Sequence, residues 1–270
     1  MIRQNLHTHT LFDDGKDAPE EMAEAAVRAG MTSLGFSVHS TLPWRNDWCL
    51  QKGDIPGYLA AVENTRRDFA GRLLIFSGLE WDIFSDQNTS GFDYVIGSMH
   101  QIRVDGCFPS VDESPACTGS ILERHFSSDA DAFAEKYYAQ YAAVAEAAFV
   151  DIVGHFDLIT KFDEKFGFFN SSSRRYTDAA MSALELLVRK DKLFEVNTGA
   201  VSRGWRSTPY PSHSLLRELK ARGARLVVSS DAHSADAIAF AFDRTEELLR
   251  SLGFRERWEL TEHGFAPVAL

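Results

Sequence analysis

Short apolar runs alternate with segments of helical periodicity along the whole chain, which is the pattern of strand–helix units built around a parallel sheet. Apolar residues recur with a period near 3.6 in the helical segments and stand in continuous runs in the strands. The predicted strands are Leu34 to Val38, Leu73 to Leu79, Tyr94 to Gly97, Asp151 to Gly154, Leu193 to Asn197 and Arg225 to Ser229, after a first short strand that ends before His7. About seven such units favour an α/β fold in which the sheet closes into a barrel.

The helical segments follow the strands in turn. They are Pro19 to Ala29, Ile55 to Phe69, Asp129 to Phe149, Asp178 to Lys190, Ser212 to Arg222 and Asp236 to Leu252. No internal repeat or Gly/Ser/Pro linker interrupts the alternation, so we expect one domain over residues 1–270. The least regular stretch, Gln101 to Arg124, holds two prolines and two glycines and is predicted to be a long loop that covers a site.

Composition narrows the classes of function. The formal net charge of −11 argues against a nucleic-acid-binding surface, which needs clustered Lys and Arg. The chain has no apolar run of membrane-spanning length, and its first residues are not those of a secretory signal, so we expect a cytoplasmic protein. Three cysteines without C-x-x-C spacing indicate free thiols. The sequence leaves the oligomeric state open, and a small phosphate ester remains possible as a partner because bound metals supply positive charge.

Ionisable side chains fall where strands end. Six of the nine histidines, together with a glutamate and two aspartates, lie at or shortly after predicted strands. A lone His in such a place is usually a packing or capping residue, but parallel barrel strands all end at one face, where active sites sit. His7 and His9, spaced i, i+2 in an extended segment, point to the same side. Imidazole and carboxylate ligands without thiolates favour a catalytic site for Zn²⁺, Mn²⁺ or Fe²⁺.

Eight short motifs together resemble the polymerase and histidinol phosphatase (PHP) superfamily, in order and in spacing. They are HTHT (7–10), DG (14–15), SVHS (37–40), GLE (78–80), GSMH (97–100), GHFD (154–157), EVNT (195–198) and SDAH (230–233). The segment from Gly154 to Lys161 and the run from Glu195 to Ser212 are most similar to the histidinol-phosphate phosphatases within it. The resemblance implies a distorted (β/α)7 barrel, a trinuclear metal centre and hydrolysis of L-histidinol phosphate to L-histidinol and phosphate in histidine biosynthesis.

Carried over by motif, the resemblance implies a role for each matched residue. It assigns His7, His9, Glu80 and Asp231 to a first metal; Glu80, His100 and His155 to a second; and Asp14, His39 and His233 to a third. Glu80, Asp231 and His233 are expected to be essential for catalysis.

Other residues remain as candidates from their place after strands. Lys161, Asn197, Arg203 and Arg206 are candidates for binding the phosphate group, since each lies just beyond a strand end. Asp157 is expected either to orient His155 or, with slight preference, to cap the next helix. Asp13 competes with Asp14 as a ligand, but alternation should turn only one of the two toward the metals.

Three other functions stay open for such a chain. The same kind of centre serves a phosphodiesterase or exonuclease, or a protein-tyrosine phosphatase. A metal-binding barrel without turnover is the third alternative, and the full set of ligands argues against it.

Overall fold

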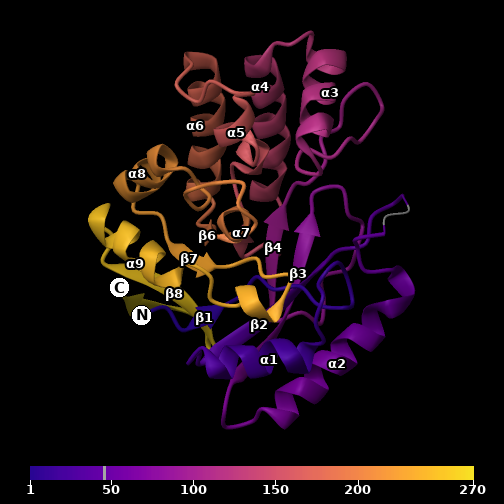
Figure 1. Ribbon diagram of the computed structural model, residues 1–270, viewed down its shortest axis with the longest axis vertical. Helices are drawn as coiled ribbons and strands as arrows, with labels where there is room; N and C mark the ends of the chain where they lie inside the picture. The colour runs from indigo at the N-terminus through magenta and orange to yellow at the C-terminus, as the bar shows by residue number, and fades with distance from the viewer. Residues whose placement is uncertain (45–46) are drawn as a thin grey trace.

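The apolar runs form one parallel sheet of seven strands that neighbour each other in chain order, from β1 to β7. The computed structural model describes residues 1–44 and 47–270 (Figure 1). The strands are β1 (Gln4–Asn5), β2 (Ser33–His39), β3 (Leu74–Asp82), β4 (Tyr94–Ser98), β5 (Ile152–Val153), β6 (Leu193–Asn197) and β7 (Leu226–Ser229). The predicted strands are therefore present, with ends shifted by up to three residues.

The sheet curves round until its first and last strands meet. Just beyond β1 and β7, Thr8 and Ala232 form a parallel bridge, with His9 N donating to Ala232 O at 2.9 Å and Ala232 N to His7 O at 3.2 Å. This seam is short, whereas β2 and β3 pair over seven residues. The predicted distorted barrel of seven strand–helix units is confirmed.

Helices cover the outside of the barrel, with α1 and α2 at one end of Figure 1 and α3, α4 and α6 at the other. They are α1 (Pro19–Arg28), α2 (Ile55–Asp68), α3 (Pro115–Phe126), α4 (Ala130–Tyr141), α5 (Asp163–Phe166), α6 (Arg174–Arg189), α7 (Gly199–Ser202), α8 (His213–Ala221) and α9 (Phe242–Ser251). Short 3₁₀ turns, η1 to η4, lie at Lys52–Asp54, Ala142–Ala145, Leu158–Thr160 and Ala235–Ala237. Within residues 1–44 and 47–270, no helix combines the length and the apolar content needed to cross a membrane.

Two expectations about the elements are wrong. The segment Gln101 to Arg124 is not loop throughout, because α3 begins at Pro115, where Ser114 Oγ accepts a hydrogen bond from Cys117 N and a proline occupies the first helical position. The segment Asp236 to Leu252 is not one helix, since α9 begins only at Phe242, after a residue with positive φ, Ala241.

The sequence analysis also missed an antiparallel hairpin at the end of the described chain. It consists of β8 (Glu256–Thr261) and β9 (Gly264–Ala269). The side chain of Gln4 binds the backbone of Leu260 twice, with Nε2 donating to its carbonyl at 2.8 Å and Oε1 accepting from its N–H at 2.7 Å. A side-chain amide thus joins the hairpin to β1.

The inward-pointing side chains of the strands form two layers inside the barrel, one apolar and one polar. Along β3, Phe76 belongs to a buried apolar cluster inside the barrel, which Leu260 of the hairpin joins. The residues of β3 that alternate with it, such as Ile75 and Leu79, point outward and pack in the cluster beneath the helices. Because side chains alternate with a period of two, the inward positions after Phe76 are Gly78, Glu80 and Asp82. The apolar layer therefore lies beneath the polar residues at the carboxyl ends of the strands.

Tyr94 fills the middle of the barrel and needs two glycines to fit there. Its ring lies against Gly35 and Gly78, where an added Cβ would come within 2.3 Å and 2.2 Å of Tyr94 atoms. Its hydroxyl donates to Leu6 O, which ties β4 to the segment after β1. The phenol is fully buried, so neither glycine has room for a side chain.

We expect Gly78→Ala to lower the free energy of unfolding by about 1–3 kcal/mol, because the new methyl group overpacks against Tyr94. Urea unfolding followed by circular dichroism measures the change. Gly53→Ala is the control, since no atom lies within 4 Å of a Cβ at Gly53. Equal unfolding midpoints for the two variants would contradict the tight packing.

Candidate metal centre

All nine predicted ligands meet at the carboxyl ends of the strands. His39 is the last residue of β2, and Glu80 lies inside β3, two residues before its end. The others lie in the segments that follow the strands: His7, His9 and Asp14 after β1, His100 after β4, His155 after β5, and Asp231 and His233 after β7. The structure therefore brings together every residue predicted as a ligand.

Glu80 occupies the centre of the cluster. One carboxylate oxygen, Oε2, lies 3.1 Å from His7 Nε2 and 2.9 Å from His39 Nδ1. The other, Oε1, lies 2.8 Å from His155 Nε2 and 3.3 Å from His100 Nε2. Imidazoles from four segments thus surround a carboxylate that is almost fully buried.

Asp231 faces the first two histidines across the seam between β1 and β7. Its Oδ1 lies 3.4 Å from His9 Nε2 and 3.8 Å from His7 Nε2. Asp231 has a φ of 51°, a left-handed conformation that costs a non-glycine residue roughly 1–3 kcal/mol and that clusters at functional sites. Gly199 makes room for this carboxylate, since a Cβ there would lie 2.7 Å from Asp231 Oδ2.

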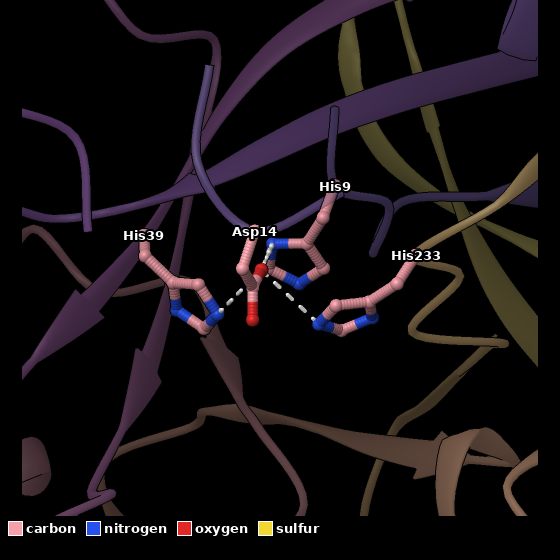
Figure 2. Close-up of side chains that lie close together, drawn as sticks. All are labelled: His9, Asp14, His39 and His233. Carbon is pink, nitrogen blue, oxygen red and sulfur yellow. Dashed lines mark ion pairs between the residues drawn. The ribbon is translucent and has the colours of Figure 1, made fainter. Parts of the chain in front are cut away.

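A third group of side chains lies toward solvent, around Asp14 (Figure 2). Asp14 Oδ1 lies 3.2 Å from His233 Nε2, 3.6 Å from His39 Nε2 and 3.8 Å from His9 Nδ1. The side chains of Asp14 and His233 are 35% and 24% exposed, whereas that of His9 is fully buried. Asp14 and His233 therefore mark the open side of the cluster.

The donor set fits divalent cations. His7 Nε2, His9 Nε2 and Glu80 Oε2 are buried and have no hydrogen-bond partner in the described part of the chain, although they face one another. Buried polar atoms are rarely left in this state. Ligand atoms about 2.0–2.2 Å from one cation lie roughly 3–3.5 Å apart. The separations around Glu80, from 2.8 to 3.3 Å, are close to that range. Four overlapping groups of such ligand atoms, each compact enough for one ion, are present.

The electrostatics of the cluster favour positive charge. Burial raises the pKa of Glu80, but the imidazoles of His7 and His39 outweigh it and hold that pKa well below its usual value. Burial lowers the pKa of His9, but Asp13 outweighs it and the pKa rises to about 10. Glu80 is therefore ionised at neutral pH, and its carboxylate stabilises a cation placed beside it.

Three carboxylates behind the cluster orient its histidines. Glu195 Oε1 lies 2.6 Å from His7 Nδ1, and its Oε2 accepts from His155 N at 2.8 Å. Asp13 Oδ2 lies 2.7 Å from His9 Nδ1, and Asp82 Oδ2 accepts from His100 N at 3.0 Å.

At His7 and His9 the carboxylate contacts ring Nδ1 and so fixes the ring and its tautomer, leaving Nε2 free for a ligand, whereas at His155 and His100 it fixes the backbone. Asp13 therefore lies behind His9, while Asp14 faces the histidines. The sequence analysis assigned no role to Asp82 or Glu195, although a charged residue inside a buried strand such as β6 is the signal that marks Glu195.

Asp157 does neither of the two things expected of it. Its side chain makes no cap to η3, so the preferred prediction is wrong. Instead, Asp157 Oδ2 accepts from Ser212 N at 2.9 Å and lies 3.9 Å from Arg206 Nη1. Asp157 thus fixes the start of α8 against the segment that follows β5.

The predicted phosphate-binding residues occupy different surroundings. Arg203 Nη2 lies 3.0 Å from Asp231 Oδ2, and its Nη1 lies 3.2 Å from His233 Nδ1. Asn197 Nδ2 lies 3.0 Å from Glu195 Oε2, and its Oδ1 accepts from Gly199 N. Arg203 is about a third exposed, on the same open side as His233, whereas Asn197 is fully buried.

Lys161 and Arg206 are held by other parts of the chain. Lys161 Nζ donates to the backbone and to the carboxylate of Asp112, at 2.8 and 2.9 Å. Burial raises the pKa of Asp112, but the charges of Lys161 and His100 outweigh burial and bring that pKa down to about 2. Because His100 contributes, the Lys161–Asp112 pair lies within the electrostatic field of the cluster. Arg206 is buried over the Tyr210 ring and donates to Thr208 O and Thr160 Oγ1.

Comparisons with known proteins agree on one family. The family model described as PHP domain matches residues 5–199. A probable histidinol-phosphatase of Deinococcus radiodurans is 30% identical over 263 residues, covering 92% of this chain and 93% of that protein. The histidinol-phosphatase of Bacillus subtilis is 24% identical, covering 90% of this chain and 98% of its own.

A solved structure shares the fold. The histidinol phosphate phosphatase of Lactococcus lactis, crystallised with zinc, L-histidinol and phosphate, superposes with a TM-score of 0.76 at 18% identity. It covers 98% of both chains.

We expect Glu195→Gln to weaken binding of Zn²⁺ or Mn²⁺ about 10–100-fold, because the amide no longer holds His7 Nδ1 with a full negative charge. Competition with a chromophoric chelator gives the affinity. Glu185→Gln, on the exposed face of α6 beside Arg222, is the control and should bind like the wild type. Wild-type affinity in Glu195→Gln would rule out its orienting role.

Proposed function

The chain belongs to the PHP domain family, and on that basis we propose that it hydrolyses a phosphate monoester, L-histidinol phosphate, to L-histidinol and phosphate. The observation that carries the proposal is the set of overlapping ligand groups around Glu80, with Arg203 beside their open side. Similarity to curated histidinol-phosphatases over nine tenths of the chain supports the choice of substrate. We assign residues 1–270 to one catalytic domain, since the terminal hairpin joins the barrel interior.

The metal ligands are assigned in three sets. His7, His9, Glu80 and Asp231 would hold the first ion; Glu80, His100 and His155 the second; and Asp14, His39 and His233 the third. Glu80 would take part in the first two sets, since one of its carboxylate oxygens lies 3.1 Å from His7 Nε2 and the other 2.8 Å from His155 Nε2. Bound divalent ions supply Lewis acidity to the phosphoryl oxygens and lower the pKa of water, which the slow hydrolysis of a monoester requires.

The protein's own side chains bind and orient the ester. Arg203 has donors on the open side of the cluster, and a guanidinium binds phosphate oxygens through two parallel hydrogen bonds. Lys161 supplies a second positive charge at a position fixed by Asp112. Asn197 acts on the substrate indirectly, since its amide holds Glu195 and the start of α7. Arg206 remains a third candidate for the phosphate, with donors that Thr160 and Thr208 already engage.

The purified protein is expected to carry at least two equivalents of Zn, Mn or Fe, because two of the ligand groups share Glu80 and the other groups extend the cluster on either side. Elemental analysis of protein prepared without chelators measures the content. Glu80→Ala should bind at least one ion fewer and lose turnover while its circular dichroism spectrum stays unchanged. One metal or none in the wild type, with no activation by added metal, would contradict the assignment.

Arg203→Met and Lys161→Met are each expected to lower kcat/KM for L-histidinol phosphate by about one to two orders of magnitude, since each removes a charge-assisted contact. Arg174→Met is the control, because Arg174 is 93% exposed on α6. Arg206→Met is measured together with its thermal midpoint, so that loss of stability is separated from loss of phosphate binding. Near-wild-type kcat/KM in all three variants would remove these residues from the phosphate site.

The wild type is expected to hydrolyse L-histidinol phosphate with a higher kcat/KM than phosphotyrosine or a nitrophenyl phosphodiester. Steady-state rates on the three compounds with the same metal-loaded preparation give the order. Faster hydrolysis of the diester would indicate that the protein is a phosphodiesterase. A preference for phosphotyrosine would indicate that it is a protein-tyrosine phosphatase.

A further inference from the structure

A cavity of about 170 Å³, separate from the metal centre, lies between α7, α8 and α9. None of the nine proposed metal ligands lines it. Most of its wall surface is apolar, and Val201, Pro209, Ala241 and Leu248 contribute to it. The other lining residues are Thr198, Ser207, Thr208 and Thr245, with His213 and Arg244 as the charged or ionisable ones. An apolar cavity of about 150 Å³ in another protein accepts benzene, so this one has room for a six-membered ring.

Two of the polar lining residues, Arg244 and His213, have side-chain nitrogens without a partner in the described part of the chain. The side chain of Arg244 is exposed and makes no hydrogen bond or ion pair with the residues that the structure describes. His213 Nε2 is buried and likewise has no hydrogen-bond partner among them.

The backbone adds to the positive potential of the cavity. His213 is the first residue of α8, and Ala241 immediately precedes α9, so the amino ends of both helices contribute lining residues. Neither helix has a side-chain cap, which leaves N–H groups at these ends free to interact with an anion.

No acidic side chain is among the residues that line the cavity. Glu164 is engaged by Ser207, whose N–H and hydroxyl lie 2.7 and 3.2 Å from its carboxylate oxygens. Asp243 is the neighbour of Arg244 in α9 but is not a lining residue, since consecutive helical side chains do not face each other. An anion at Arg244 therefore meets no competing carboxylate among the residues that line the cavity.

We propose that this cavity binds a small carboxylate with a hydrophobic ring, in which Arg244 takes the carboxylate and the apolar walls take the ring. The site is also placed to regulate the metal centre. One lining residue, Val201, belongs to α7, and the residue that follows this helix, Arg203, contacts Asp231 and His233. A bound ligand thus packs against the helix that positions Arg203.

Benzoate is the probe, and its binding to the metal-loaded wild type is measured by ligand-observed NMR or calorimetry. Arg244→Met should raise the Kd about 10–100-fold, because it removes a charge-assisted contact. Benzamide, which is uncharged and of the same shape, should bind the wild type more weakly by a similar factor. Arg217→Met is the matched control, since it removes the same charge from an exposed position on α8 and should leave the Kd unchanged.

Each alternative outcome overturns a defined part of the proposal. Equal benzoate affinity in Arg244→Met and wild type would overturn the site itself and indicate binding at the metal centre. Regulation is tested by phosphomonoester turnover with and without benzoate, which should change in the wild type and in Arg217→Met but not in Arg244→Met. Benzoate binding that depends on Arg244 without any change in turnover would overturn the regulatory role. The binding experiment does not depend on the proposed phosphatase activity.

Discussion

Glu80 carries a carboxylate almost completely removed from water, and burying such a group costs several kcal/mol unless cations or hydrogen-bond donors surround it. Its neighbours come from four different segments, because no single helix or strand can place four imidazoles around one carboxylate. Parallel strands that end at one face of a barrel do this. These histidines in turn need partners of their own. Asp13 contacts the ring of His9, while Asp82 and Glu195 accept hydrogen bonds from the backbone N–H groups of His100 and His155.

The part of the fold and site that rests on local periodicity could be predicted from the sequence. Apolar runs gave the strands, and the His, Asp and Glu residues at their ends, from His7 to His233, lie together in the structure. Glu80 was expected after its strand and lies inside β3, which extends to Asp82. That shift leaves Glu80 on the inner face, because position within the alternation, not the strand boundary, decides where the side chain points.

The part that rests on contacts between distant residues could not be predicted. The partner of Glu195 is 188 positions earlier in the chain, and that of Gln4 is 256 positions later, so no local pattern reveals either pair. Pro115 and Gly119 suggested a loop, yet Ser114 and Pro115 start α3, because the same residue types serve at helix starts and in turns. Asp157 likewise occupied a capping position by sequence, and Ser212 engages it instead.

The seam between β1 and β7 gives the proposed first metal site a mechanical consequence. Two backbone hydrogen bonds join these segments, and the ligands assigned to the first ion stand on both sides of them, His7 and His9 on one and Asp231 on the other. An ion held there cross-links the first and last strands of the barrel. Metal exchange and local opening of the seam then become linked equilibria, so that the concentration of free metal also sets the fraction of molecules in which the seam is open.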